Sequence, residues 1–114
     1  MIKEGIYSAV FGGTASIAKG IFVLKEGRMV GLNFDGARHQ GTYQYDPVRK
    51  SVTFDLITAL MPNTTLVTGD EVPEQGYKLR TRGEAPLPDP LSRFSLDVLG
   101  KAVDVALTFE SPLP

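Results

Sequence analysis

The sequence predicts an all-β protein, a single domain folded as an eight-stranded antiparallel meander barrel. Apolar and polar residues alternate with a period of two along most of the chain, which is the spacing of a strand with one buried face. No segment shows the apolar spacing of a helix. Turn signals separate the alternating segments at intervals of about 8–12 residues, as in sandwiches and barrels. The 114-residue length fits one domain.

The first three predicted strands, residues 6–11, 20–24 and 28–34, are apolar on both faces. A strand of this kind is buried on both sides. One side can face the barrel core, and the other needs a cover, either a loop or a second subunit. We therefore predict a homodimer whose interface includes residues of these strands. The predicted interface residues are Ile6, Val10, Ile21, Val23 and Met29.

The third of these strands has two distinguishable faces. Val30, Leu32 and Phe34 form one face, and Met29 leads the other. The hairpin turn before this strand is Glu26-Gly27, and short turns of this kind favour sequential antiparallel neighbours.

The remaining predicted strands have one apolar and one polar face, as an antiparallel sheet with one solvated side requires. They cover residues 42–45, 51–56, 77–82, 94–98 and 102–109. Two longer connections interrupt the rhythm. Residues 60–76 could hold a short extra strand at 65–68 or act as a flap, and the proline-dense residues 83–90 are expected to be extended.

Aromatic side chains on the predicted inner faces are the first candidate site. They could line a pocket for a lipid-like, apolar ligand, or they could simply fill the core, as in many small barrels. The candidate lining residues are Phe22, Tyr43, Tyr45, Phe54, Tyr77, Phe94 and Phe109.

Composition excludes several kinds of chemistry. The chain has no cysteine and a single histidine, His39, so we expect no disulfide, no thiolate nucleophile and no metal site. A nucleophile elbow of the Gly-x-Ser-x-Gly type is also missing. We therefore predict no catalytic residues, no cofactor and no enzymatic activity, with His39 in a structural or solvated role.

Charge and hydropathy narrow the choice of partners and compartment. Twelve basic and thirteen acidic residues give a net charge of −1, which argues against binding to nucleic acid or to an anionic membrane. The first residues lack the apolar stretch of a signal peptide, and no apolar run is as long as a membrane span. We therefore expect a cytoplasmic protein.

Two charged segments carry alternative interpretations. Lys78, Arg80 and Arg82 occupy one face of a predicted strand, where they could bind an acidic partner or form a solvated surface. The acidic segment 70–74 could recognise a partner or be a solvated loop.

A pattern in the first 45 or so residues resembles the GrlR family of negative regulators of type III secretion transcription. It consists of Gly5-Ile6-Tyr7-Ser8, Gly20-Ile21-Phe22-Val23-Leu24, Glu26-Gly27-Arg28, Val30-Gly31-Leu32-Asn33-Phe34-Asp35 and Gln40-Gly41-Thr42-Tyr43. The resemblance implies a lipocalin-like eight-stranded barrel, a homodimer and a regulatory role in bacteria.

The family's best-known member binds its partner through an acidic loop after the fourth strand. In this chain the corresponding residues 45–50 read Tyr-Asp-Pro-Val-Arg-Lys, so that partner site is not carried over. We expect a non-enzymatic regulatory or interaction protein, and the alternative is a protein that binds an apolar small molecule inside the barrel.

Overall fold

The computed structural model describes residues 2–88 and 90–114, and its architecture is all-β, as the sequence predicts. Eight antiparallel strands make up the fold. Their bounds are β1 Gly5–Gly12, β2 Ile17–Lys25, β3 Arg28–Asn33, β4 Arg38–Asp46, β5 Ser51–Leu60, β6 Tyr77–Pro86, β7 Leu91–Val98 and β8 Lys101–Ser111. Within the described residues there is no helix long and apolar enough to cross a membrane.

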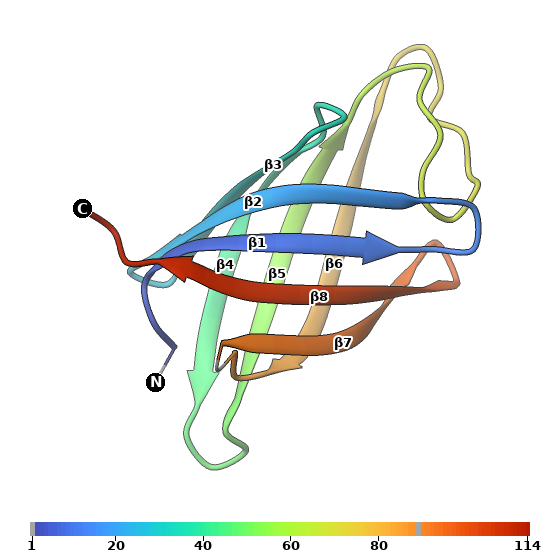
Figure 1. The fold of residues 1–114 in the computed structure, drawn as a ribbon. Coiled ribbons are helices and arrows are strands. Elements are labelled where there is room, and N and C mark those ends of the chain that lie inside the picture. Colours follow the sequence, from blue (N-terminus) through green and yellow to red (C-terminus); the bar gives the residue numbers. More distant parts are fainter. Residues whose placement is uncertain (1, 89) are drawn as a thin grey trace.

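The strands form a nearly closed meander barrel. Their order across the sheet is β6-β5-β4-β3-β2-β1-β8-β7, so each strand from β1 to β5 pairs with the next one in the chain. Pairing of β8 with β1 then folds the β7–β8 hairpin back onto the first strand. In Figure 1, β2, β1 and β8 run across the front of the molecule, and β4, β5 and β6 cross behind them at a steep angle.

One seam of the barrel lies between β6 and β7, which stand at opposite ends of the strand order and share no ladder. The chain between these strands contains Pro88 and Pro90, which lack the backbone N–H that a tight hairpin uses. At the end of the seam where β6 ends and β7 begins, a side chain links the two strands. Ser92 Oγ donates a hydrogen bond of 2.7 Å to the Pro86 carbonyl. Of the predicted extended stretch 83–90, residues 83–86 complete β6, and Asp89 lies outside the described residues.

Two hairpins turn through a pair of residues with positive φ. Glu26 and Gly27 have φ values of 52° and 78°, and Leu99 and Gly100 have values of 52° and 80°. Two consecutive positive φ angles are typical of a type I′ turn, whose twist matches that of the flanking strands. Leucine is a poor residue for this conformation, because its Cβ crowds the following carbonyl.

Replacing Leu99 with asparagine is therefore expected to stabilise the protein. Leu99 is 47% exposed, so little burial is lost, and Asn-Gly is the preferred type I′ pair. The free energy of unfolding should rise by about 0.5–1 kcal/mol, measured by denaturant titration. Gly100→Ala is the control with the opposite sign, because φ is +80° at that position. Destabilisation by Leu99→Asn would show that the leucine side chain contributes packing that its exposure does not reveal.

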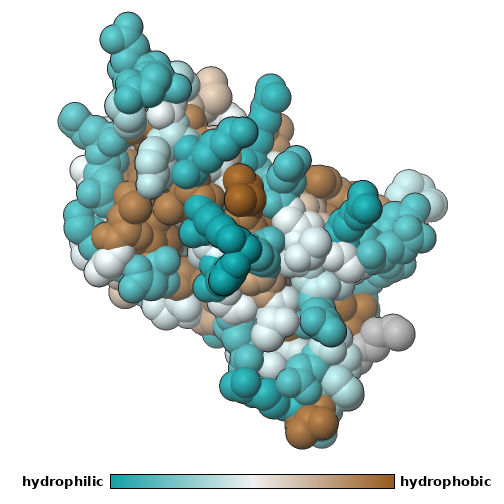
Figure 2. Space-filling model, turned by 180° about the vertical axis from the view of Figure 1, so that it is seen from behind, coloured by the Kyte–Doolittle hydropathy of each residue, from teal (hydrophilic) through white to brown (hydrophobic). Residues whose placement is uncertain are grey.

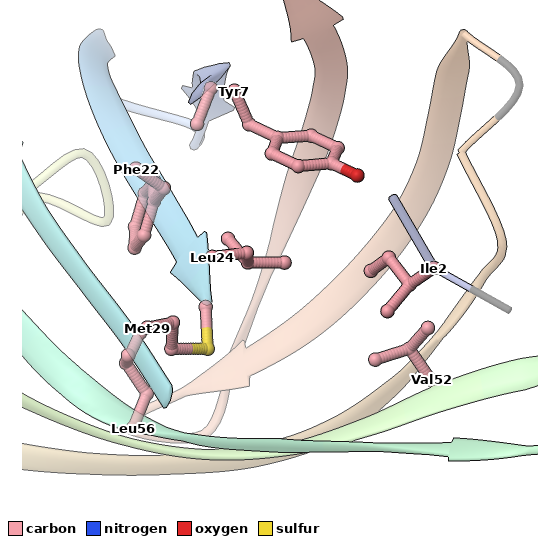
Figure 3. Packing of buried hydrophobic residues seen from close by; sticks show 8 residues of the cluster. Ile2, Tyr7, Phe22, Leu24, Met29, Val52 and Leu56 are labelled. Carbon is pink, nitrogen blue, oxygen red and sulfur yellow. The ribbon is translucent and has the colours of Figure 1, made fainter. Parts of the chain in front are cut away.

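The core is built from residues far apart in the sequence. Figure 3 shows side chains from the N-terminal segment, β1, β2, β3 and β5 pointing into one interior space. Tyr7 is 1% exposed, and its hydroxyl donates a hydrogen bond to the Lys3 carbonyl. Burial raises the pKa of Tyr7 to about 12, so this hydroxyl stays protonated and holds the N-terminal segment against β1.

The β5–β6 loop, residues 61–76, folds back over one end of the barrel (Figure 1). The Val67 carbonyl accepts hydrogen bonds from the backbone N–H groups of Ala15 and Ser16, in the β1–β2 turn. Lys101 Nζ lies 3.5 Å from the Thr68 carbonyl. The predicted extra strand at 65–68 is not present: this segment contributes only a single bridge, between Thr65 and Glu71.

Candidate functional site: the outer apolar face and the barrel interior

The outer surface of β1, β2 and β3 carries an unusual number of exposed apolar side chains. Ile21 is 45% exposed, Val30 54%, Leu32 53% and Phe34 75%. Cross-strand register places them next to one another, because Ile21 pairs with Leu32 and Val23 pairs with Val30. We call this surface the outer apolar face. Its residues are Ile6, Val10, Ile21, Val23, Val30, Leu32 and Phe34.

Four of the five predicted interface residues lie on the outer apolar face. Ile6 and Val23 are paired and half-buried, and Val10 and Ile21 are exposed. Met29, in contrast, lies in the core cluster and is only 9% exposed. Its register explains this position, because Met29 pairs with Leu24, which is 2% exposed, and directly opposed residues share one face of a sheet.

The outer surface of β5 and β6, separated from β3 by β4, is charged. Arg80 contacts Asp55 through two hydrogen bonds, of 2.9 and 2.6 Å, and Arg82 lies 3.5 Å from the same carboxylate. The hydrogen bond from Arg80 holds the pKa of Asp55 below its usual value. Two of the three residues in the predicted basic row are therefore partly neutralised within the chain. Figure 2 shows the rear of the molecule, where hydrophobic areas are interrupted by hydrophilic side chains.

The acidic segment 70–74 belongs to the β5–β6 loop. Asp70 accepts a hydrogen bond of 2.6 Å from Thr68 and lies 3.4 Å from Lys101 Nζ. The hydrogen bond from Thr68 is the main cause that lowers the pKa of this carboxyl. Asp70 thus has a structural contact that ties the loop to the start of β8.

The middle of the barrel interior is almost filled. It holds an apolar cavity of about 50 Å³, whereas pockets for drug-sized ligands have volumes of about 300–1,000 Å³. Four of the predicted lining residues, from four different strands, surround this cavity. They are Phe22, Tyr43, Phe54 and Phe94.

The other three predicted lining residues lie elsewhere. Tyr45 and Phe109 are half-buried and pack against the core cluster, and the Phe109 ring meets Tyr7 edge-on with centroids 5.3 Å apart. Tyr77, at the start of β6, is 47% exposed. The period-two pattern correctly predicted that Tyr77 belongs to a strand. Tyr77 is the first residue of β6, however, and the buried residues of this strand begin only at Thr81.

A buried polar cluster, for which no function is predicted from the sequence, occupies the barrel interior near the β5–β6 loop. His39 is 8% exposed; its Nε2 lies 2.9 Å from Asn33 Oδ1 and its Nδ1 lies 2.7 Å from Thr58 Oγ1. The asparagine oxygen can only accept, so Nε2 carries the proton and Nδ1 accepts from the threonine hydroxyl. Both nitrogens of the imidazole are therefore hydrogen-bonded.

Aromatic packing surrounds this histidine. The Phe22 ring centroid lies 4.9 Å from that of His39, and the Phe11 ring is stacked at 6.0 Å. Burial lowers the pKa of His39 to about 4, although the negative charge of Asp35 acts in the opposite direction. A second cavity, of about 90 Å³, adjoins the cluster and is lined by His39, Asn33, Thr58 and Thr81 together with aliphatic side chains.

No group of acidic, histidine or cysteine residues suited to hold a metal ion occurs among residues 2–88 and 90–114. No protein-family model and no curated protein matches the chain.

Proposed function

We propose that this chain is a non-enzymatic interaction protein that acts as a homodimer, with the outer apolar face as the contact between subunits. The observation that carries the proposal is the side-by-side exposure of Ile21, Val30 and Leu32 on adjacent strands. Contiguous exposed apolar surface is a mark of a protein contact, and its burial is favourable by about 25 cal/mol per Å².

A second copy of the same chain fits this face. The apolar side chains lie on three neighbouring strands, so two copies can pack sheet against sheet, as the layers of a β-sandwich do. The long side chains at the edge, Lys19 and Arg38, are exposed and can extend into water while their stems cover apolar surface. β2 and β3 carry no acidic side chain, and the Glu110 carboxylate beside the β1 part of the face accepts a hydrogen bond from Ser8.

The size of the interior supports the interaction role over the alternative of a lipid-like ligand. Cavities of about 50 and 90 Å³ are far below the 300–1,000 Å³ or so that a larger ligand occupies. The aromatic side chains predicted to line a ligand pocket, among them Phe22, Tyr43 and Phe54, pack together and leave a cavity of only about 50 Å³.

A regulatory role in the bacterial cytoplasm is the further part of this proposal. It rests on the resemblance of residues 5–43 to the GrlR family and on the absence of cysteine. The loop after β4 carries Arg49 and Lys50 in place of an acidic run, so a protein partner would have to be recognised by other surfaces.

Replacing Leu32 with lysine is expected to weaken self-association at least ten-fold, because it places a charge among apolar side chains at the contact. Leu32 is 53% exposed, so the protomer should keep its fold. Analytical ultracentrifugation measures the change in dimer dissociation constant. Thr53→Lys, at an exposed position on β5, is the matched control and should leave the dimer intact. A wild-type protein that sediments as a monomer at micromolar concentrations would refute the proposal.

A further inference from the structure

The two strands that border the seam, β6 and β7, each have one edge without a strand partner. β6 pairs along its whole length with β5, from Tyr77 to Pro86, and β7 pairs with β8. In an antiparallel strand, alternate residues direct their N–H and C=O groups to opposite sides, so about half of these groups in β6 point toward the seam. No ladder receives them there, and such an edge is a template for pairing with another strand.

The seam is tight at one end and wider at the other. Near the end of β6, Ser92 is hydrogen-bonded to Pro86, and a Cβ built on Gly83 would lie 3.0 Å from Leu96 Cδ2, so β7 packs against β6 there. From that end, β6 extends toward the β5–β6 loop, whereas β7 extends toward the β7–β8 turn (Figure 1). The free part of the edge is therefore the first part of β6, residues 77–82.

The inner side of this free edge suits small aliphatic side chains. Leu79 of β6 and Val98 of β7 line the cavity of about 90 Å³ described above. A strand added to β6 would direct every second side chain to this inner side. Asp35 lines the same cavity, so an inward carboxylate of the added strand would meet a like charge.

The outer side of the same edge is basic. Lys78, Arg80 and Arg82 alternate along β6, and all three are exposed. Arg80 and Arg82 share one carboxylate, that of Asp55, and in the part of the chain that the structure describes no ion pair to Lys78 is found. Three positive charges against one negative charge leave an excess of two. Acidic side chains on the outer side of an added strand would complement this excess, because opposite charges on neighbouring strands attract.

The same charges disfavour a second copy of this chain as the added strand. Two β6 edges paired with each other would bring the basic side chains of both copies together. Like charges on directly opposed strands are destabilising, and lysine on an edge strand is a common means of preventing such self-pairing. The charge of the edge therefore favours a different protein as the partner.

We propose that residues 77–82 of β6 bind an extended segment of another protein as an added strand, whose acidic side chains face outward and alternate with aliphatic side chains that face inward. In this mode of recognition, backbone hydrogen bonds supply affinity and the alternate side chains supply selectivity. The inference rests on the proposed interaction role. It is independent of the dimer contact, because β4 and β5 separate β6 from β3 in the strand order.

The test is titration of the full chain with a short capped peptide in which glutamate and valine alternate, followed by amide chemical shifts. The peptide should shift the resonances of Leu79, Arg80 and Thr81, and its counterpart of lysine and valine should bind about ten-fold more weakly. Two further peptides carry N-methyl groups, one at each valine and the other at each glutamate. Only one of them should lose affinity, by about ten-fold, because alternate residues direct their N–H groups to opposite sides of a strand.

The variant Lys78→Glu tests the charge of the edge. It should weaken binding of the glutamate–valine peptide by about five-fold, because an attraction between neighbouring strands becomes a repulsion. Lys25→Glu makes the same change of charge at an exposed position at the end of β2, and it should leave peptide binding unchanged.

Other outcomes would overturn the proposal, and sedimentation tests the dimer separately. Full affinity of both N-methylated peptides would show that the peptide does not pair as a strand. Shifts confined to Ile21 and Val30, and abolished by Leu32→Lys, would place the peptide on the outer apolar face. A dimer that dissociates in Lys78→Glu would place a second copy on the β6 edge. An absence of any shift at millimolar peptide would exclude the edge as a site, whereas a monomeric wild-type protein that binds the peptide at β6 would refute the dimer alone.

Discussion

Replacing Phe22 with alanine is expected to lower the free energy of unfolding by about 4 kcal/mol, within the range seen when a buried phenylalanine is truncated. Phe22 is 3% exposed and lies at the centre of the interior. Its ring covers Gly31 so closely that a Cβ built on Gly31 would lie 2.6 Å from it, and the ring also packs against His39. Gly31 has no side chain to fill the space that alanine would leave, so the existing cavity of about 50 Å³ would grow.

Equilibrium denaturation in urea measures this loss, and Phe34→Ala supplies the matched control. Phe34 is 75% exposed, so its truncation should change the stability of a protomer by about 0.5 kcal/mol or less. Both variants should be compared at protein concentrations below those at which dimers form, because Phe34 belongs to the outer apolar face. If Phe22→Ala cost no more than Phe34→Ala, the interior would be loosely packed around this ring, contrary to the contacts described above.

The architecture could be predicted from the sequence because the period-two signal is local. Residues 102–109 alternate so regularly that their strand and the preceding hairpin are evident without any long-range information. The inner and outer faces of β1 to β3 could not be assigned in the same way. When Met29 and Val30 are both apolar, only pairing with a neighbouring strand shows which one faces the core.

The unsealed seam also depends on long-range geometry. The near-closure of the barrel depends on pairing of β1 with β8, whose residues are separated by most of the chain, and this pairing leaves β6 and β7 as the two unpaired edges. The proline-rich connection predicted extended structure, but it did not show that β6 and β7 would lack a shared ladder. The same prolines, which cannot donate a backbone hydrogen bond, account for the missing tight hairpin between β6 and β7 at this end of the seam.

The buried cluster around His39 had a sequence signal that the prediction missed. Tyr43 is a half-buried residue of β4 that lines the apolar cavity, and counting back by twos from it passes through Gly41 to His39. Extending the predicted strand from residue 42 back to Arg38 would have placed His39 on the inner face. Its partner Thr58 could not be identified in this way, because their pairing depends on the register of β4 with β5.

Acidification is expected to destabilise the protein through His39. The pKa of this histidine is about 4 in the folded protein and about 6.5 in the unfolded chain, so the unfolded state binds the proton more readily. The stability that comes from the neutral imidazole is complete above pH 6.5 and is lost as the pH falls from 6.5 toward 4. From the linkage relation, the free energy of unfolding should be about 2 kcal/mol lower at pH 5 than at pH 7.5.

The variant His39→Gln separates this effect from other titrations. Glutamine can still donate a hydrogen bond to Asn33, but it does not titrate, so its stability should change much less between pH 7.5 and 5. Asp55 and Asp70 do not confuse the comparison, because their pKa values are lowered from 3.8 by hydrogen bonds from Arg80 and Thr68, and both stay charged at pH 5. If the free energy of unfolding changed with pH in the same way in both proteins, the prediction would be wrong. Protonated His39 would then keep a partner for its second proton, because the Thr58 hydroxyl can rotate and accept a hydrogen bond from Nδ1.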